Sequence, residues 1–187
     1  MRKGKAKFER RDSSASVSID LDGLGKVNLA SGSAFLDHML AAFSRTGLLD
    51  LDAKTSGDGY YKYRSLGSAI GLAIDNALGD RGGIRRYGSA TIPMDESLAD
   101  VALDFSGRTY IVFEGCFKGD KIGDLDTQEI KPFLEALADG ARMTLHIRSN
   151  GENDHHKAES IFKALGFAVR QAVAKEGKGI PSTKGII

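Results

Sequence analysis

The chain has 187 residues, enough for one ordinary globular domain or two small fused ones. Apolar residues make up 41% and charged residues 27% of the sequence, which excludes an intrinsically disordered chain and a membrane protein. The formal net charge of +1 excludes the strongly basic field of a typical nucleic-acid-binding protein. Cys116 is the single cysteine, so no intramolecular disulfide can form, and without an apolar targeting segment we expect a cytoplasmic protein.

Apolar spacing predicts the same series of elements twice. Alternation predicts a strand at 14–21, and a helix at about 33–46 and a short strand at 48–53 follow it. In the next helix apolar residues recur at helical spacing from Leu66 to Leu78, and Gly79 is suited to its C-cap. The second series is expected at 98–105, about 126–141, 143–148 and in a last helix through 161–173.

Three similarities between the halves of the chain indicate a duplication. Any one of them could arise by chance between short segments, but all three occur in the same order. We therefore expect one compact α+β domain made of two tandem repeats, residues 1–84 and residues 85–187. The similar segments are 12–23 with 96–107, 35–37 with 133–135, and 60–64 with 155–159.

The four histidines supply candidate metal ligands. His155 and Glu159 are four residues apart, so on a helix they share a face and can chelate one cation. His156 points roughly 100° away around the helix axis, so it would serve a different ion. Imidazole and carboxylate ligands suit manganese, iron or zinc. For His155 and His156 the alternative is that both are solvated at a polar helix start. For His38 and His146 the alternative is a structural role in the core or at an interface.

Basic residues beside glycine-containing turns are candidate phosphate ligands. Arg86 comes shortly after two glycines, Arg108 follows Gly107, and Lys184 ends a Pro-Ser-Thr-Lys segment. A loop that offers a hydroxyl group, free backbone N–H groups and a cation is suited to phosphate. Each of these residues could instead be a solvated surface charge. The sequence contains neither of the common glycine-rich nucleotide-binding motifs.

Seven motifs give the chain a specific resemblance to a known family. In order, they are FLDHML (35–40), GIRRYG (83–88), PMDE (93–96), DFSGR (104–108), MTLHI (143–147), HHKAE (155–159) and IPSTKG (180–185). In these motifs the chain is similar to the imidazoleglycerol-phosphate dehydratases of histidine biosynthesis, over nearly its whole length. The resemblance implies a duplicated α+β fold like that of ribosomal protein S5 domain 2, in which helices cover one face of a small sheet in each repeat. It also implies a homo-oligomer, a trimer or a trimer-built cage of about 24 subunits, with active sites at subunit contacts.

The resemblance further implies which residues form the active site. Members of the family are hydro-lyases that remove water from a phosphorylated small molecule, with two Mn(II) ions that hold its imidazole ring. Neither a nucleic acid nor a membrane is an implied partner. Carried over to this chain, the roles are phosphate binding by Arg86, Arg108, Ser182 and Lys184, catalysis by Asp12 and Glu96, and metal binding by His38, His146, His155, His156 and Glu159.

The chain departs from the family in the first of two His-His-x-x-Glu motifs. The positions of two histidines, a glutamate and the following aspartate are taken by Tyr60, Tyr61, Arg64 and Ser65. An arginine stays charged and cannot ligate a metal, so Arg64 should repel a cation. We therefore expect at most one metal ion per subunit, or none. The family arrangement implies one site of His38, His155 and Glu159 beside Tyr61, and another of His146 and His156 beside Tyr60 and Arg64.

Three functions remain open at this point. The chain could be a divergent dehydratase whose activity is doubtful or reduced, because one metal site is lost while the phosphate ligands are retained. It could be a non-catalytic or re-purposed paralogue that binds a phosphorylated small molecule. A purely structural subunit is the third alternative, and the retained phosphate ligands weigh against it.

Overall fold

The computed structural model describes residues 1–57, 61–177, 179–182 and 185. Within these residues the elements are β1 Lys3–Glu9, β2 Ser13–Asp20, β3 Val27–Ala30, α1 Ala34–Gly47, β4 Asp50–Gly57, α2 Lys62–Leu78, β5 Tyr87–Met94, β6 Ser97–Asp104, β7 Tyr110–Glu114, β8 Lys121–Ile122, β9 Leu125–Asp126, the 3₁₀ turn η1 Thr127–Glu129, α3 Ile130–Gly140, β10 Thr144–Asn150 and α4 Asp154–Val173. None of these helices is long and apolar enough to cross a membrane.

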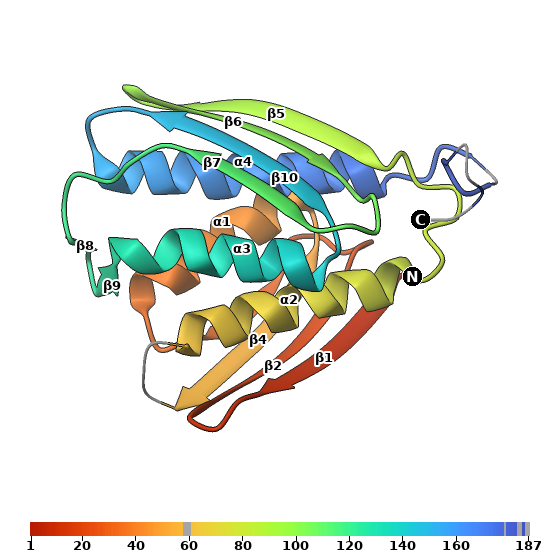
Figure 1. Cartoon of the computed structure of the whole chain (residues 1–187), viewed down its shortest axis with the longest axis horizontal. Helices are drawn as coiled ribbons and strands as arrows, with labels where there is room; N and C mark the ends of the chain where they lie inside the picture. Colours follow the sequence, from red (N-terminus) through yellow and green to blue (C-terminus); the bar gives the residue numbers. More distant parts are fainter. Residues whose placement is uncertain (58–60, 178, 183–184, 186–187) are drawn as a thin grey trace.

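Two four-stranded sheets enclose the four helices (Figure 1). The first sheet has the order β1-β2-β4-β3 and the second the order β5-β6-β10-β7. In each sheet the first two pairings are antiparallel and the last is parallel. The two halves therefore share one topology, which confirms the expected α+β fold of two repeats.

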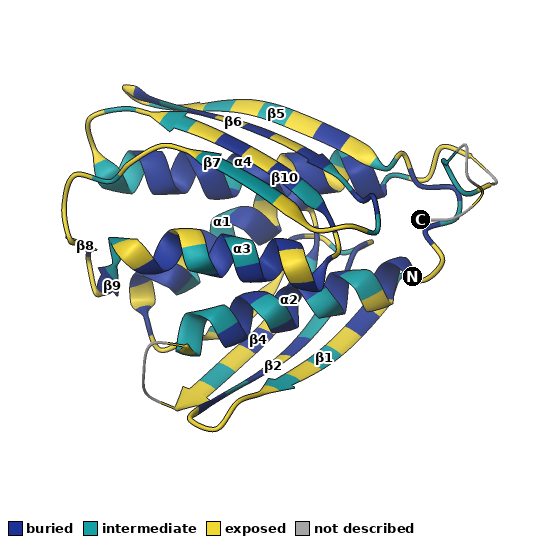
Figure 2. Ribbon diagram, in the orientation of Figure 1, coloured by how far each residue is buried: buried dark blue, intermediate teal, exposed yellow. Residues whose placement is uncertain are grey.

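Strand residues alternate between the helical layer and the outer surface (Figure 2). In β2 the side chains of Ala15, Val17 and Ile19 are at most 4% exposed, while Ser16 between them is exposed. Burial of one face of each sheet against the helices is what fixes this register, because a shift by one residue would turn the apolar face to solvent. The outward faces are left free to carry polar residues.

The helices pair across the repeats. Helix α1 of the first repeat packs on α4 of the second, and α3 packs on α2. Glycines allow the close approach: a Cβ on Gly71 of α2 would lie 2.3 Å from the Leu137 carbonyl of α3, and one on Gly166 of α4 would lie 2.4 Å from the Phe43 carbonyl of α1. This pairing of helices between the repeats places the start of α4 beside α1.

The predicted elements are found, with shifted ends. Gly79 is the C-cap of α2, with a φ of 58° and its N–H bonded to the Asp75 carbonyl, as predicted. The strand expected at 48–53 begins later, at Asp50, because Leu48 takes a left-handed conformation that ends α1. The helix expected from about 126 begins at Ile130, after the 3₁₀ turn.

Arg81 joins the two repeats from inside the molecule. Its side chain is 1% exposed, and its guanidinium pairs with Asp75 at 2.5 Å. It also donates to the carbonyl groups of Phe105 and Ala141, at 3.1 and 3.0 Å, both in the second repeat. A buried guanidinium is tolerated when it is paired and hydrogen-bonded in this way.

Candidate metal and phosphate site

The junction of α1 and α4 brings His38, His155 and Glu159 together. Asn153 caps α4, and its side chain accepts from the backbone N–H groups of His155 and His156, which fixes the first turn. The Oε2 atom of Glu159 lies 3.2 Å from Nε2 of His155 and 3.4 Å from Nε2 of His38. One ligand atom from each residue lies within 4.8 Å of the other two, so the three could hold a metal ion.

Glu159 is held so that one oxygen faces both imidazole rings. Its side chain is 10% exposed, and its other oxygen, Oε1, lies 2.7 Å from the Lys163 ammonium group. Burial raises the pKa of Glu159, but the hydrogen bond and charge of Lys163, with His38 and His155, lower it below its usual value. The carboxylate is therefore ionised and ready to bind a cation.

His156 lies on a different side of α4 and meets the predicted catalytic residue Glu96. Its Nδ1 atom lies 2.8 Å from Glu96 Oε2, and Asp95 is 3.7 Å from its other ring nitrogen. The hydrogen bond with Glu96 raises the pKa of His156, and the same bond holds the pKa of Glu96 well below its usual range. Glu96 Oε1 also accepts from the backbone of Glu152 and Asn153, so it fixes the approach to α4.

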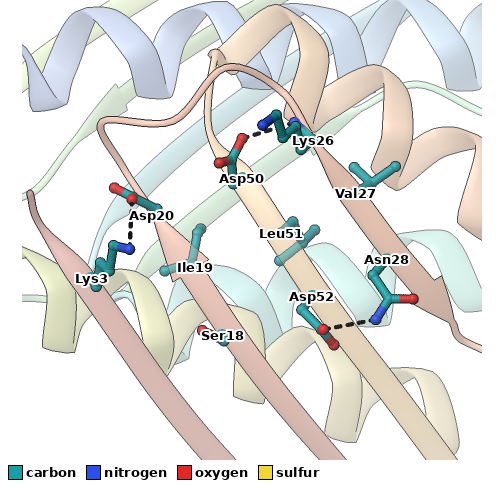
Figure 3. A pocket seen from close by; sticks show the side chains of 10 residues that line it. All are labelled: Lys3, Ser18, Ile19, Asp20, Lys26, Val27, Asn28, Asp50, Leu51 and Asp52. Carbon is teal, nitrogen blue, oxygen red and sulfur yellow. Dashed lines mark hydrogen bonds and ion pairs between the residues drawn. The ribbon is translucent and has the colours of Figure 1, made fainter.

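His146 lies apart from these groups, on the outer face of the second sheet. It is exposed on β10 and lines a hollow of about 480 Å³ with Asp100, Arg148 and five other residues of β5 and β6. On the first sheet a hollow of about 290 Å³ lies mainly over β2, β4 and β3 (Figure 3). There Asp52 takes the place of His146 and accepts from the Asn28 side chain at 2.8 Å. The first sheet therefore offers no histidine at this position.

The described members of the predicted phosphate set, Arg86, Arg108 and Ser182, lie toward the other end of α4. The Arg86 backbone N–H donates to the carbonyl of Ala172, near the helix end, and Arg86 Nη1 donates to the carbonyl of Pro181, beside Ser182. Arg108 follows the turn at Phe105, and the backbone N–H of Phe105 donates to the Arg86 carbonyl. His155 and Ala172 are seventeen residue steps apart along α4, which at 1.5 Å per step span about 25 Å. Within one chain, the predicted phosphate ligand Arg86 therefore lies far from the histidines at the start of α4.

The Arg86 guanidinium is already engaged within the chain. Nε and Nη2 donate to the two carboxylate oxygens of Asp104 at 2.6 and 3.0 Å. This bidentate bond raises the pKa of Arg86. Arg108, in contrast, is exposed. The predicted ligand Lys184 lies outside the described residues.

The substituted motif of the first repeat lies at the start of α2. Each of its described residues has its own environment. Tyr61 is 40% exposed, with the Arg10 guanidinium 4.9 Å from its ring centroid, and Asp12 lines the same hollow. Arg64 is half-buried and faces α3, where it lines a small hollow. Ser65 is fully buried and hydrogen-bonds to Ser13 at 2.9 Å. The other substituted residue, Tyr60, lies outside the described residues.

Sequence reasoning missed two groups that shape the site. Lys163 follows Glu159 by four residues, a spacing that places opposite charges side by side on a helix and could have identified it. Phe35 packs its ring against His155, with centroids 5.2 Å apart, and this contact depends on the pairing of α1 with α4. No local pattern signals that pairing.

Comparison with known proteins identifies the family of the chain. The sequence profile of the family "Imidazoleglycerol-phosphate dehydratase" matches residues 31–169. The chain is a member of this family. An imidazoleglycerol-phosphate dehydratase of Methanococcoides burtonii is 43% identical over the whole of both chains, and one of Methylorubrum extorquens is 46% identical over 96% of this chain and 97% of its own.

Solved structures of dehydratases share the fold. The structure from Staphylococcus aureus has a TM-score of 0.84 and 33% identity and covers 92% of this chain and 99% of its own. The structure from Pyrococcus furiosus has a TM-score of 0.85 and 32% identity, over 97% and 99%. The expected resemblance to the imidazoleglycerol-phosphate dehydratases is thus confirmed for the full length of the chain.

Proposed function

We propose that this protein is a cytoplasmic hydro-lyase of the imidazoleglycerol-phosphate dehydratase type, with one metal ion per chain and reduced activity. The observation that carries the proposal is the cluster of His38, His155 and Glu159, whose ligand atoms already converge. The donor set of two imidazoles and one carboxylate fits Mn(II) or a similar divalent ion. Such an ion would supply Lewis acidity and hold a ring nitrogen of the substrate.

The residues of the chain supply the remaining functions. Lys163 holds the carboxylate of Glu159 in its ionised form, and Glu96 orients His156 by a 2.8 Å hydrogen bond. Glu96 and Asp12 are the carboxylates available to move protons. Arg108, with Ser182, Lys184 and the tethered Arg86, binds the substrate phosphate.

We propose that each active site is shared between copies of the chain. A small substrate cannot reach from the histidines to phosphate ligands about 25 Å away at the far end of the same helix. A second copy, in a trimer or a trimer-built cage, would supply the missing half. Tyr60 and Arg64 would then take the place of ligands for the second metal ion, and Tyr61 would lie beside the ion held by His38, His155 and Glu159.

Arg64 supports an alternative function. A fixed positive charge in place of a carboxylate opposes the second ion, and loss of one preorganised electrostatic partner commonly lowers kcat by about 10²–10³-fold. A paralogue that binds a phosphorylated small molecule without turning it over would retain the same phosphate ligands. Metal content and turnover separate the two.

The test measures Mn per chain by elemental analysis and dehydration of imidazoleglycerol phosphate on the same preparation. We expect one Mn per chain, lost in Glu159→Gln and retained in the control Glu135→Gln on α3, together with slow turnover. Arg64→Glu should raise the metal content. Two ions per chain in the unmodified protein would overturn the assignment of Arg64, and phosphate-ligand binding without metal or turnover would support the alternative.

A further inference from the structure

A lysine is buried inside the histidine motif. The Lys157 side chain is 3% exposed, although lysine is among the residues least often fully buried. Its Nζ atom lies 2.6 Å from the Asp154 carboxylate and donates to the Cys116 carbonyl at 2.6 Å. The same ammonium group lies 5.5 Å from the centroid of the Phe117 ring. Lys157 thus binds the first turn of α4 to the segment after β7.

Asp154 fastens the same segment from the helix side. Its carboxylate accepts from the backbone N–H groups of Lys118, at 2.8 Å, and Gly119, at 2.7 Å. These bonds and those of Lys157 form one network around residues 116–119. Because the ammonium group is buried and its partner carboxylate half-buried, removal of Asp154 would leave a buried charge without compensation.

The segment that Lys157 holds also reaches α1. Beyond β8, the Asp124 carboxylate accepts from the Ser33 hydroxyl at 2.7 Å and from the backbone N–H groups of Ala34 and Phe35 at 2.7 and 3.0 Å. One connection, residues 115–126, therefore ties together the starts of α1 and α4. These are the two helices that bring His38 to His155 and Glu159.

Lys157 cannot itself serve the metal site. At 100° per residue it lies roughly 160° around the helix from Glu159, on the side of the connection. Its effect on the site must pass through the backbone of the first turn of α4. Groups that orient metal ligands in this indirect way commonly determine affinity.

We propose that Lys157 is a positioning residue, which clamps residues 116–119 onto the first turn of α4 and thereby sets His155 opposite His38 and Glu159. The proposal rests on the proposed function in one respect, the metal bound by these three residues. It predicts a local effect at the start of α4 as well as a change in metal affinity.

The test replaces Lys157 by methionine, which keeps the length of the side chain, and in a second variant makes Asp154→Asn. Two quantities are measured: amide hydrogen exchange of residues 154–159 and 116–119, and the Kd for Co(II) followed by its absorption spectrum. We expect faster exchange in both segments and a Kd raised about 10- to 100-fold. The control is Ala168→Gly, buried near the other end of α4, which should lower Tm and leave both quantities unchanged.

The two measurements distinguish a failure of the positioning role of Lys157 from a failure of the proposed metal function. Unchanged exchange in both segments for Lys157→Met and Asp154→Asn would overturn the clamp. Faster exchange with an unchanged Kd would show a clamp that does not position the ligands, and would overturn the positioning role. If the unmodified protein binds no Co(II), the proposed metal function fails, and the exchange of residues 154–159 alone decides whether Lys157 orders the histidines.

Discussion

At the scale of single residues, Arg64 changes the ionisation of a buried neighbour. Glu129 is 9% exposed, and its Oε2 atom has no hydrogen-bond partner among the described residues. Burial raises the pKa of Glu129, Asp126 raises it further, and the charge of Arg64 opposes both. A carboxyl group with a raised pKa in the folded state costs stability once the pH exceeds its pKa in the unfolded chain.

Arg64→Met should therefore destabilise the protein in a pH-dependent way. Without the guanidinium the pKa of Glu129 rises further, so the loss in unfolding free energy should be roughly 0.5–1 kcal/mol at pH 7. It should vanish below about pH 4, where the carboxyl group is protonated in both states. Urea unfolding at pH 4 and pH 7 measures the difference. In a Glu129→Gln background the pH dependence should disappear, and its persistence there would assign the effect to other carboxylates near Arg64.

At the scale of elements, the buried helices were predictable and the edge strands were not. Apolar residues at helical spacing identified α2 and α4, because both helices are buried by that stripe. Strand β1 is missing from the sequence predictions because its inward residues are Gly4, Ala6 and Phe8, and small residues between lysines give little apolar alternation. Its pairing with β2 depends instead on the packing of α2.

Glycines in the edge strands bring each sheet against its helix. A Cβ on Gly88 of β5 would lie 1.9 Å from the Ala168 carbonyl of α4, and a Cβ on Gly4 of β1 would lie 1.9 Å from the Ala73 carbonyl of α2. Both contacts are with backbone atoms, which cannot avoid the added Cβ by a change of rotamer. The two repeats therefore use the same device at equivalent positions.

Gly88→Ala should be strongly destabilising. The strand must move away from α4, and overpacking of this kind costs about 1–3 kcal/mol or more. Gly4→Ala should cost a similar amount for the same reason. Urea unfolding measures both, with Gly177→Ala as the control, because no atom lies within 4 Å of a Cβ built there. A loss as small as that of the control would show that the edge strands adjust freely.

At the scale of the whole molecule, the duplication was predictable from the similar segments of the two halves, whereas the separation of the predicted metal and phosphate ligands along α4 was not. The pair of His155 and Glu159 follows from helical spacing alone. Their distance from the predicted phosphate ligands follows from the length of α4 and from the hydrogen bond that joins the C-terminal segment to Arg86. We propose that the first repeat ends at residue 84 and the second begins at residue 85. The buried Arg81, whose side chain bonds to the second repeat, lies just before this boundary.

The proposal that active sites are shared between chains leads to a prediction about mixed assemblies. His155→Ala removes a proposed metal ligand and Arg108→Ala a proposed phosphate ligand, so each variant alone should have little activity. If the two halves of a site come from different chains, co-expression of both variants at equal levels should restore about one quarter of the sites, because random pairing joins the two intact halves that often. The measurement is the dehydration rate of the purified mixed assembly per chain. A mixture of His155→Ala with Glu159→Ala is the control and should recover nothing, since both defects lie in the same half. Recovery no greater than in this control would mean that a single chain completes its own site.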